Sequence, residues 1–270
     1  LPENSLAITV DDGFHSFRKL AVPVLDRYQY PATVYVTTYY VGKGAPIFRL
    51  VVQYMFWKAA RTPVSLEGQA WTAVKTLDLS DRAAVEKATW ECIDYGEGSC
   101  TEVERQRLCE ELGRLLGVPY DAIVPDRALH LMTPDELRDL AGHGVAVEPH
   151  THHHRFPADD RAAASREIAE NRTALDEWLP GERRHFCYPS GLWDTRQWAW
   201  LDDLGVRSST TCVASRICIP KNGYAMDVLS GVRQSAYHSF NSDSRRVPMA
   251  FSSTAPHRMI CRRCSMRGAR

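Results

Sequence analysis

The sequence contains no apolar stretch close to the roughly 20 residues that a membrane-spanning helix needs, so we expect no transmembrane segment. It also has no excess charge of either sign, because Lys+Arg and Asp+Glu both total 33. No overall electrostatic field therefore draws the chain to nucleic acid or to an anionic membrane. The first residues carry no basic segment followed by an apolar run, so no signal peptide is expected in this chain.

The eight cysteines lack the regular spacing of a disulfide framework. Cys187 and Cys212 fall in expected strands, where a buried free thiol is the simplest interpretation. Cys261 and Cys264 have the C-x-x-C spacing, but without a second pair this spacing indicates a zinc site only weakly. The cysteines therefore do not identify the redox compartment.

Short apolar runs alternate with segments of helical periodicity along much of the chain. The expected strands are residues 6–10, 32–37, 145–148, 185–188, 206–212 and 228–232, and the expected helices are 16–28, 133–141, 159–178 and 193–204. This alternation indicates an α/β fold with a parallel sheet, either open or closed. The rhythm lapses over about residues 43–128, which are charged and helical, so a helical insertion is expected there.

Single residues refine three of the expected helices. Pro23 should bend or divide the helix over 16–28. Thr133 and Glu136, with Pro134 between them, predict a capping box at a helix start. Asn171-Arg172-Thr173 matches a glycosylation sequon, but it lies inside an expected helix, so we interpret the match as chance.

Two polar fragments, far apart in the chain, each follow an expected strand. They are Asp11-Asp12-Gly13 and His150-Thr151-His152-His153-His154. Parallel strands bring their carboxyl ends to one edge or face, so these carboxylates and imidazoles should meet there. A carboxylate and two imidazoles can hold one divalent metal, which leaves the second carboxylate to act as a base. The pattern predicts metal-assisted hydrolysis.

The residues alone leave part of this assignment open. Adjacent aspartates point in different directions, so we expect Asp12 to bind the metal and Asp11 to face the attacking water. His150 and His154 are four apart, close to one helical turn, but His150 with His152 on an extended segment would also suit a metal. Oxygen and nitrogen donors suit Zn²⁺ and also Co²⁺, Ni²⁺ or Mn²⁺.

These fragments resemble the motifs of the polysaccharide deacetylases of the NodB-homology type (carbohydrate esterase family 4). A strand followed by Asp-Asp-Gly is similar to residues 8–13, and His-Ser/Thr-x-x-His is similar to residues 150–154. An aromatic-Pro-x-Gly turn is similar to residues 188–191. The resemblance runs from about Leu6 to Cys212. It implies an α/β fold that is a distorted (β/α)₇ barrel with a helical insertion between the second and third strands.

The resemblance also implies roles for individual residues. The ligands of one divalent metal, expected first to be Zn²⁺, are then Asp12, His150 and His154. The general base is then Asp11. This choice favours His154 over His152. The turn implied to contact the substrate and hold the oxyanion comprises Tyr188, Pro189, Ser190 and Gly191.

The chain departs from the family pattern in two places. Many members carry, in the third motif, an arginine that pairs with the base, and Cys187 stands at that position here. Arg184 is close in sequence but is expected on the wrong side of the strand. The late motif that supplies the general acid has no clear match, and His238 is the nearest candidate. We therefore predict a deacetylase domain over residues 1–238 and an irregular basic tail over 239–270.

The function implied is removal of N-acetyl groups from an N-acetylhexosamine polysaccharide or oligosaccharide. The alternatives are hydrolysis of a small amide or imide at the same metal site, and a catalytically weak module that binds glycan or metal. Nucleic-acid binding through the basic tail is supported only by a run of charged residues. The family suggests work in the cell envelope or outside the cell. Four tryptophans are candidates for stacking on sugars, although such residues are more often core: Trp71, Trp193, Trp198 and Trp200.

Overall fold

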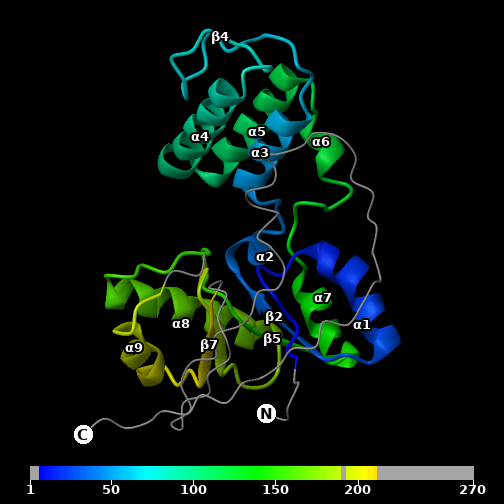
Figure 1. Cartoon of the computed structure of the whole chain (residues 1–270), viewed down its shortest axis with the longest axis vertical. Helices are drawn as coiled ribbons and strands as arrows, with labels where there is room; N and C mark the ends of the chain where they lie inside the picture. The colour runs from blue at the N-terminus through cyan, green and yellow to red at the C-terminus, as the bar shows by residue number, and fades with distance from the viewer. Residues whose placement is uncertain (1–5, 190–192, 212–270) are drawn as a thin grey trace, which may run out of the picture. The chain divides into compact units, whose positions relative to one another are not determined.

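The computed structural model describes residues 6–189 and 193–211, and from Ile8 onward these residues belong to one compact unit (Figure 1). Several predicted features lie outside the described residues: Ser190, Gly191, Cys212, the strand over 228–232, His238, and the basic tail over 239–270 with Cys261 and Cys264. The described chain is mixed α/β, as the alternating pattern predicts.

Three parallel strands form the sheet that carries the polar fragments. Its order is β1-β2-β5, with bounds Thr9–Val10, Ala32–Val36 and Val145–Pro149. Thr33 of β2 pairs with both Thr9 and Ala146, so β2 is the central strand. Its β-branched residues are almost continuously buried, as expected for a strand covered on both faces.

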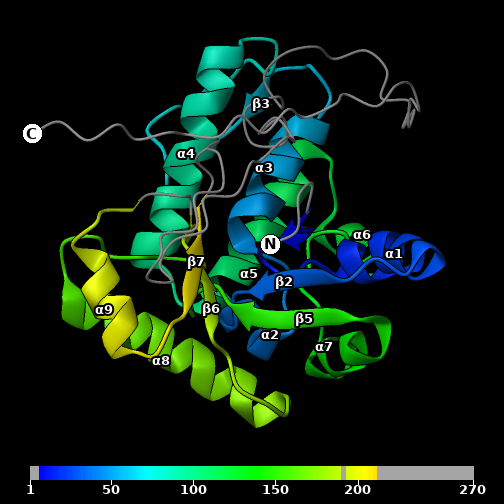
Figure 2. The same cartoon turned by 60° about the horizontal axis from the view of Figure 1, so that its bottom comes forward.

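A second parallel pair joins β6 (His185–Cys187) to β7 (Ser208–Thr210), and β6 lies beside β5 (Figure 2). The carboxylate of Glu148 in β5 accepts the backbone N–H groups of Arg184 and His185 at 3.0 Å each. A side chain thus satisfies backbone donors at the start of β6. Among the described residues no sheet closes into a barrel, so the seven-stranded barrel stays a prediction.

Helices pack against this sheet and bury its apolar side chains. The elements outside the insertion are α1 (Val22–Tyr28), α2 (Tyr39–Lys43), α7 (Pro134–Asp139), α8 (Arg161–Trp178) and α9 (Gln197–Asp203). One core joins β2 and β5 to α1, α7 and α8, and a smaller one joins α8 and α9 to β6. No described helix is both long and apolar enough to cross a bilayer.

The local predictions for these helices are confirmed. A π-helical turn over Phe17–Ala21 precedes α1, so the segment containing Pro23 is divided. Thr133 and Glu136 form the capping box at α7, with Glu136 N–H donating to Thr133 Oγ1 at 3.2 Å. A 3₁₀ turn, Leu140–His143, then ends at Gly144.

Residues 43–128, which the sequence predicts to be a helical insertion, contain more structure than their helical pattern indicates. Their elements are α3 (Phe48–Lys58), β3 (Val64–Ser65), β4 (Thr76–Leu77), α4 (Arg82–Ser99), α5 (Glu102–Leu116) and α6 (Tyr120–Ile123). The antiparallel pair β3–β4 is too short to be read from alternation. The insertion has a hydrophobic core of its own, in which Trp71 is 6% exposed, so Trp71 is a core residue and presents no face to a sugar.

Candidate metal centre

The first polar fragment forms a tight turn directly after β1. Asp12 has φ +69° and Gly13 has φ +87°, so the chain reverses in the left-handed region. A Cβ on Gly13 would lie 3.0 Å from Cγ2 of Val36, in addition to the unfavourable φ. Glycine is therefore required here, and the turn presents both aspartates at the carboxyl end of the sheet.

The second fragment is a loop that follows β5 in an unusual backbone conformation. Thr151 and His154 adopt φ +65° and +56°, and this region is particularly unfavourable for the β-branched Thr151. Such strain persists only where surrounding contacts fix the chain, and it is common at functional sites. The strained backbone turns the side chains of His150 and His154 toward Asp12.

Asn171 of α8 holds this loop through hydrogen bonds of its side-chain amide. Its Oδ1 accepts the N–H of His150 at 3.1 Å. Its Nδ2 lies within hydrogen-bond distance of Val36 O (3.0 Å), Thr38 Oγ1 (2.9 Å) and Thr151 O (2.8 Å). Asn171 is completely buried, so it serves as a structural hub rather than a glycosylation site, in agreement with the interpretation of the sequon as chance.

The carboxylate and two imidazoles converge on one point. Oδ1 of Asp12 lies 3.1 Å from Nε2 of His154 and 3.5 Å from Nε2 of His150. This oxygen is buried and has no partner of hydrogen-bond geometry in the described chain. Nδ1 of His150 lies 2.8 Å from the backbone oxygen of Cys187. A carbonyl can only accept, so Nδ1 carries the proton and the lone pair of Nε2 faces Asp12.

The charges in this group are coupled. Burial raises the pKa of Asp12, but His150 and His154 outweigh it and hold that pKa well below its ordinary value. Burial lowers the pKa of His150, whereas the neighbouring Asp12 and Asp11 carboxylates outweigh it and raise that pKa. Asp12 is therefore ionised at neutral pH, which is the form that binds a cation.

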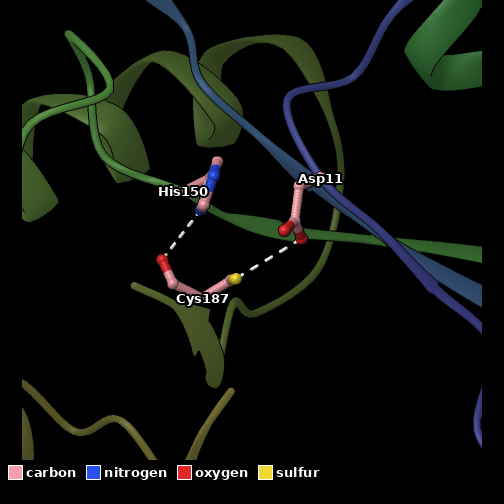
Figure 3. Close-up of side chains that lie close together, drawn as sticks. All are labelled: Asp11, His150 and Cys187. Atoms are coloured by element: carbon pink, nitrogen blue, oxygen red, sulfur yellow. Dashed lines mark hydrogen bonds between the residues drawn. The ribbon is translucent and has the colours of Figure 1, made fainter. Parts of the chain in front are cut away.

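Asp11 faces Cys187 of the third motif (Figure 3), and ligand atoms of Asp11, His150 and Cys187 also lie within 4.8 Å of one another. The thiol of Cys187 donates to Oδ1 of Asp11 over 3.4 Å, so Cys187 occupies the place beside the predicted base. Arg184 does not reach it, because its side chain pairs with Glu182. His152 also turns away from Asp12, and its Nδ1 lies 2.8 Å from Thr38 Oγ1. The structure thus brings Asp11, Asp12, His150 and His154 together.

The third motif is only partly described. Tyr188 is fully buried against Phe156 and Phe186, and its N–H donates to Thr210 O in β7 at 3.0 Å. Pro189 has no N–H, so neither residue has a backbone donor to offer an oxyanion. Ser190 and Gly191 lie outside the described residues. The Tyr188 N–H is thus engaged with β7, and the substrate and oxyanion roles expected for this motif stay predictions.

Of the remaining predicted sugar-stacking residues, Trp193 and Trp198 stack on one another with ring centroids 5.7 Å apart. Trp198 is 36% exposed and Trp200 is half-buried. The rings of Trp193 and Trp198 thus each have one face already covered by the other. Sugar stacking by this group stays a prediction.

A family model described as polysaccharide deacetylase matches residues 1–209. The chain therefore belongs to the polysaccharide deacetylase family, and the resemblance drawn from three short motifs is confirmed. Membership supports hydrolytic de-N-acetylation of an N-acetylated glycan. No curated protein matches the chain.

Three solved structures are similar to the chain at low identity. The Streptococcus pyogenes deacetylase PplD in complex with acetate is 13% identical with TM-score 0.48, covering 85% of this chain and 66% of that one. A de-N-acetylase from Aggregatibacter actinomycetemcomitans is 12% identical with TM-score 0.48, covering 85% and 71%. IcaB from Ammonifex degensii is 15% identical with TM-score 0.47, covering 85% and 69%. The chain therefore spans about two thirds of the length of the first of these structures.

Proposed function

We propose that the chain is a metal-dependent hydrolase that removes N-acetyl groups from an N-acetylhexosamine polymer or oligomer. Family membership supports the reaction class. The observation that carries the metal dependence is the convergence of Asp12, His150 and His154, whose ligand atoms all lie within 4.8 Å of one another. The family suggests that the substrate is a glycan of the cell envelope or of the extracellular space.

The spacing of the triad fits a metal ion. Two ligand atoms at about 2.1 Å from a tetrahedral ion are about 3.4 Å apart. The Oδ1–Nε2 separations of 3.1 and 3.5 Å in the triad bracket that value. Oδ1 of Asp12, which both separations share, is buried and has no hydrogen-bond partner among the described residues, and a cation would satisfy it. One carboxylate and two imidazoles favour Zn²⁺, with Co²⁺, Ni²⁺ and Mn²⁺ as alternatives.

The chain's own residues divide the chemistry between them. A divalent ion bound by the triad supplies Lewis acidity toward the acetamide carbonyl and toward water. Asp11, outside the triad, accepts a proton from the attacking water as general base, and the thiol of Cys187 holds its carboxylate in place. The amine must leave protonated as acetate is released. His238 is the residue that we predict for that proton, and the N–H groups of Ser190 and Gly191 are the donors that we predict for the oxyanion.

The test is acetate release from chitin oligomers by the purified, metal-stripped chain, with and without added Zn²⁺ or Co²⁺. We expect release that depends on the added metal. Stoichiometric metal binding without release from sugars or from small amides would instead favour the catalytically weak relative. Release from small amides alone would change the substrate class and keep the metal site.

A prediction about Cys187 tests its contact with Asp11. Cys187→Ala should lower kcat for acetate release by about fivefold, the equivalent of ~1 kcal/mol for one hydrogen bond, because the base loses its donor. Cys187→Ser should restore the rate, since a hydroxyl donates at the same place. Zn²⁺ affinity, measured by equilibrium dialysis, should be the same in both variants. Equal rates for the alanine and serine variants would contradict the positioning role.

A further inference from the structure

The loop that carries His150 and His154 also presents a second group of possible metal ligands, on its opposite side. Between His150 and His154, the side chains of His152 and His153 point toward α8 instead of toward Asp12. Their rings lie edge to face, with centroids 4.4 Å apart. One ligand atom from each of His152, His153 and Glu170 lies within 4.8 Å of the others. The proposed deacetylase chemistry uses none of these three residues.

The rings are held so that the same nitrogen of each can bind a cation. Nδ1 of His153 lies 3.0 Å from a carboxylate oxygen of Glu167, which can only accept, so Nδ1 carries the proton and Nε2 keeps its lone pair. Nδ1 of His152 lies 2.8 Å from the hydroxyl of Thr38. When this hydroxyl accepts from Nδ1–H, alongside the Nδ2–H of Asn171, Nε2 of His152 is left as its ligand atom. A carboxylate partner on the second nitrogen, such as Glu167 provides for His153, is typical of metal-binding histidines.

The backbone of the two histidines is fixed as firmly as the rings. His152 N–H donates to Glu167 O at 3.1 Å, and the carbonyl of His152 accepts from Tyr39 N–H at 3.0 Å. His153 N–H donates to the Glu167 carboxylate at 2.8 Å. The ring of Tyr39 lies against that of His153 with centroids 4.8 Å apart. Two of the three ligands are therefore preorganised, which lowers the entropic cost of binding an ion.

Glu170 supplies the carboxylate from the same helix as Glu167. The two residues are three apart on α8, so they lie on one face of the helix. Glu167 orients His153, and Glu170 is left to bind. Glu170 and His153 are exposed, so an ion can reach this position directly from solution.

We propose that His152, His153 and Glu170 form a second divalent-cation site, separate from the Asp12 triad. Two imidazoles and one carboxylate favour a transition ion such as Zn²⁺ or Cu²⁺ over Mg²⁺ or Ca²⁺. An ion there joins the loop over 150–154 to α8. It thereby stabilises the strained segment that presents His150 and His154, whether or not the triad catalyses deacetylation.

The test is the number of Zn²⁺ equivalents bound by the metal-stripped full chain, measured by equilibrium dialysis for matched variants. His153→Asn and Glu170→Gln should each bind one equivalent fewer than the unmodified chain. Glu177→Gln, an exposed change farther along α8, is the control and should bind the full number. Because the result is a difference between variants, binding by cysteines elsewhere in the chain does not affect it.

Asp12→Asn separates this site from the triad. In that variant, Zn²⁺ should still raise the thermal unfolding midpoint, and the rise should disappear when Glu170→Gln is added. Glu170 is exposed and the change is isosteric, so folding of the variant is expected, and far-UV circular dichroism verifies it. The second site is overturned if His153→Asn and Glu170→Gln bind as much Zn²⁺ as Glu177→Gln. Loss of an equivalent in Asp12→Asn would then still support the triad, so the two proposals fail separately.

Discussion

Asp11→Asn is expected to lower kcat for acetate release by about 10²–10⁴-fold and to leave the metal affinity unchanged. The amide has the shape of the carboxylate but cannot take a proton from water. Asp11 is not one of the three proposed ligands Asp12, His150 and His154, although it lies within reach of His150 in a second group with Cys187, so the proposed metal set stays complete. The amide oxygen still accepts from the thiol of Cys187, which keeps the side chain in place. The measurements are kcat with chitin oligomers at saturating Zn²⁺, and Zn²⁺ binding by equilibrium dialysis.

Asp12→Asn is the matched comparison, because the same substitution is made one residue later. It removes the charge that faces both imidazoles, so Zn²⁺ binding at the triad should fall by at least tenfold, and activity should fall with it. Unchanged turnover in Asp11→Asn would remove the base from the mechanism. Loss of Zn²⁺ in Asp11→Asn would show instead that this aspartate is a ligand, and the division of roles between the two neighbours would be wrong.

The parts of the fold that the sequence predicts are those fixed by local chemistry. Pro23 cannot continue a regular helix, and Thr133 with Glu136 satisfies backbone donors that any helix start leaves free, so both features follow from a few residues. The strands β2 and β5 could be recognised because their apolar runs are flanked by turn residues. The motif residues then fall at strand ends, which brings Asp11, Asp12, His150 and His154 to one place.

The parts that the sequence does not predict depend on contacts between distant segments. Helix α9 begins at Gln197 rather than near Trp193, and element ends are set by tertiary packing as much as by propensity. The N–H of Tyr188 is used by β7, a pairing that no local pattern encodes. Asn171 was recognised only as a chance sequon. The available signal was its position on the apolar stripe of α8, with Ile168 and Leu175, where a polar side chain needs buried partners.

Asn171→Ala is expected to lower the free energy of unfolding by about 3 kcal/mol and to weaken Zn²⁺ binding. The substitution takes a buried partner from the Thr151 carbonyl and also from His150 N–H and the Val36 carbonyl, and the latter two keep their bond to each other at 3.2 Å. Each such group costs about 1–3 kcal/mol when it is desolvated and unpaired, although backbone shifts recover part of this. The loop over 150–154 holds its strained conformation through these contacts, so the positions of His150 and His154 should become less defined. Urea denaturation and Zn²⁺ dialysis measure the two effects.

Thr173→Ala is the control, because it also destroys the sequon but lies on the exposed side of α8, where its hydroxyl donates to Ala169 O at 2.9 Å. It should change the free energy of unfolding by less than about 0.5 kcal/mol, as is usual for surface positions. Equal losses in the two variants would attribute the effect to the sequon rather than to the buried amide. If Asn171→Ala instead retains both stability and Zn²⁺ affinity, the loop is fixed by its contacts with Glu167 and Tyr39 alone. The hub at Asn171 would then have no part in presenting the triad.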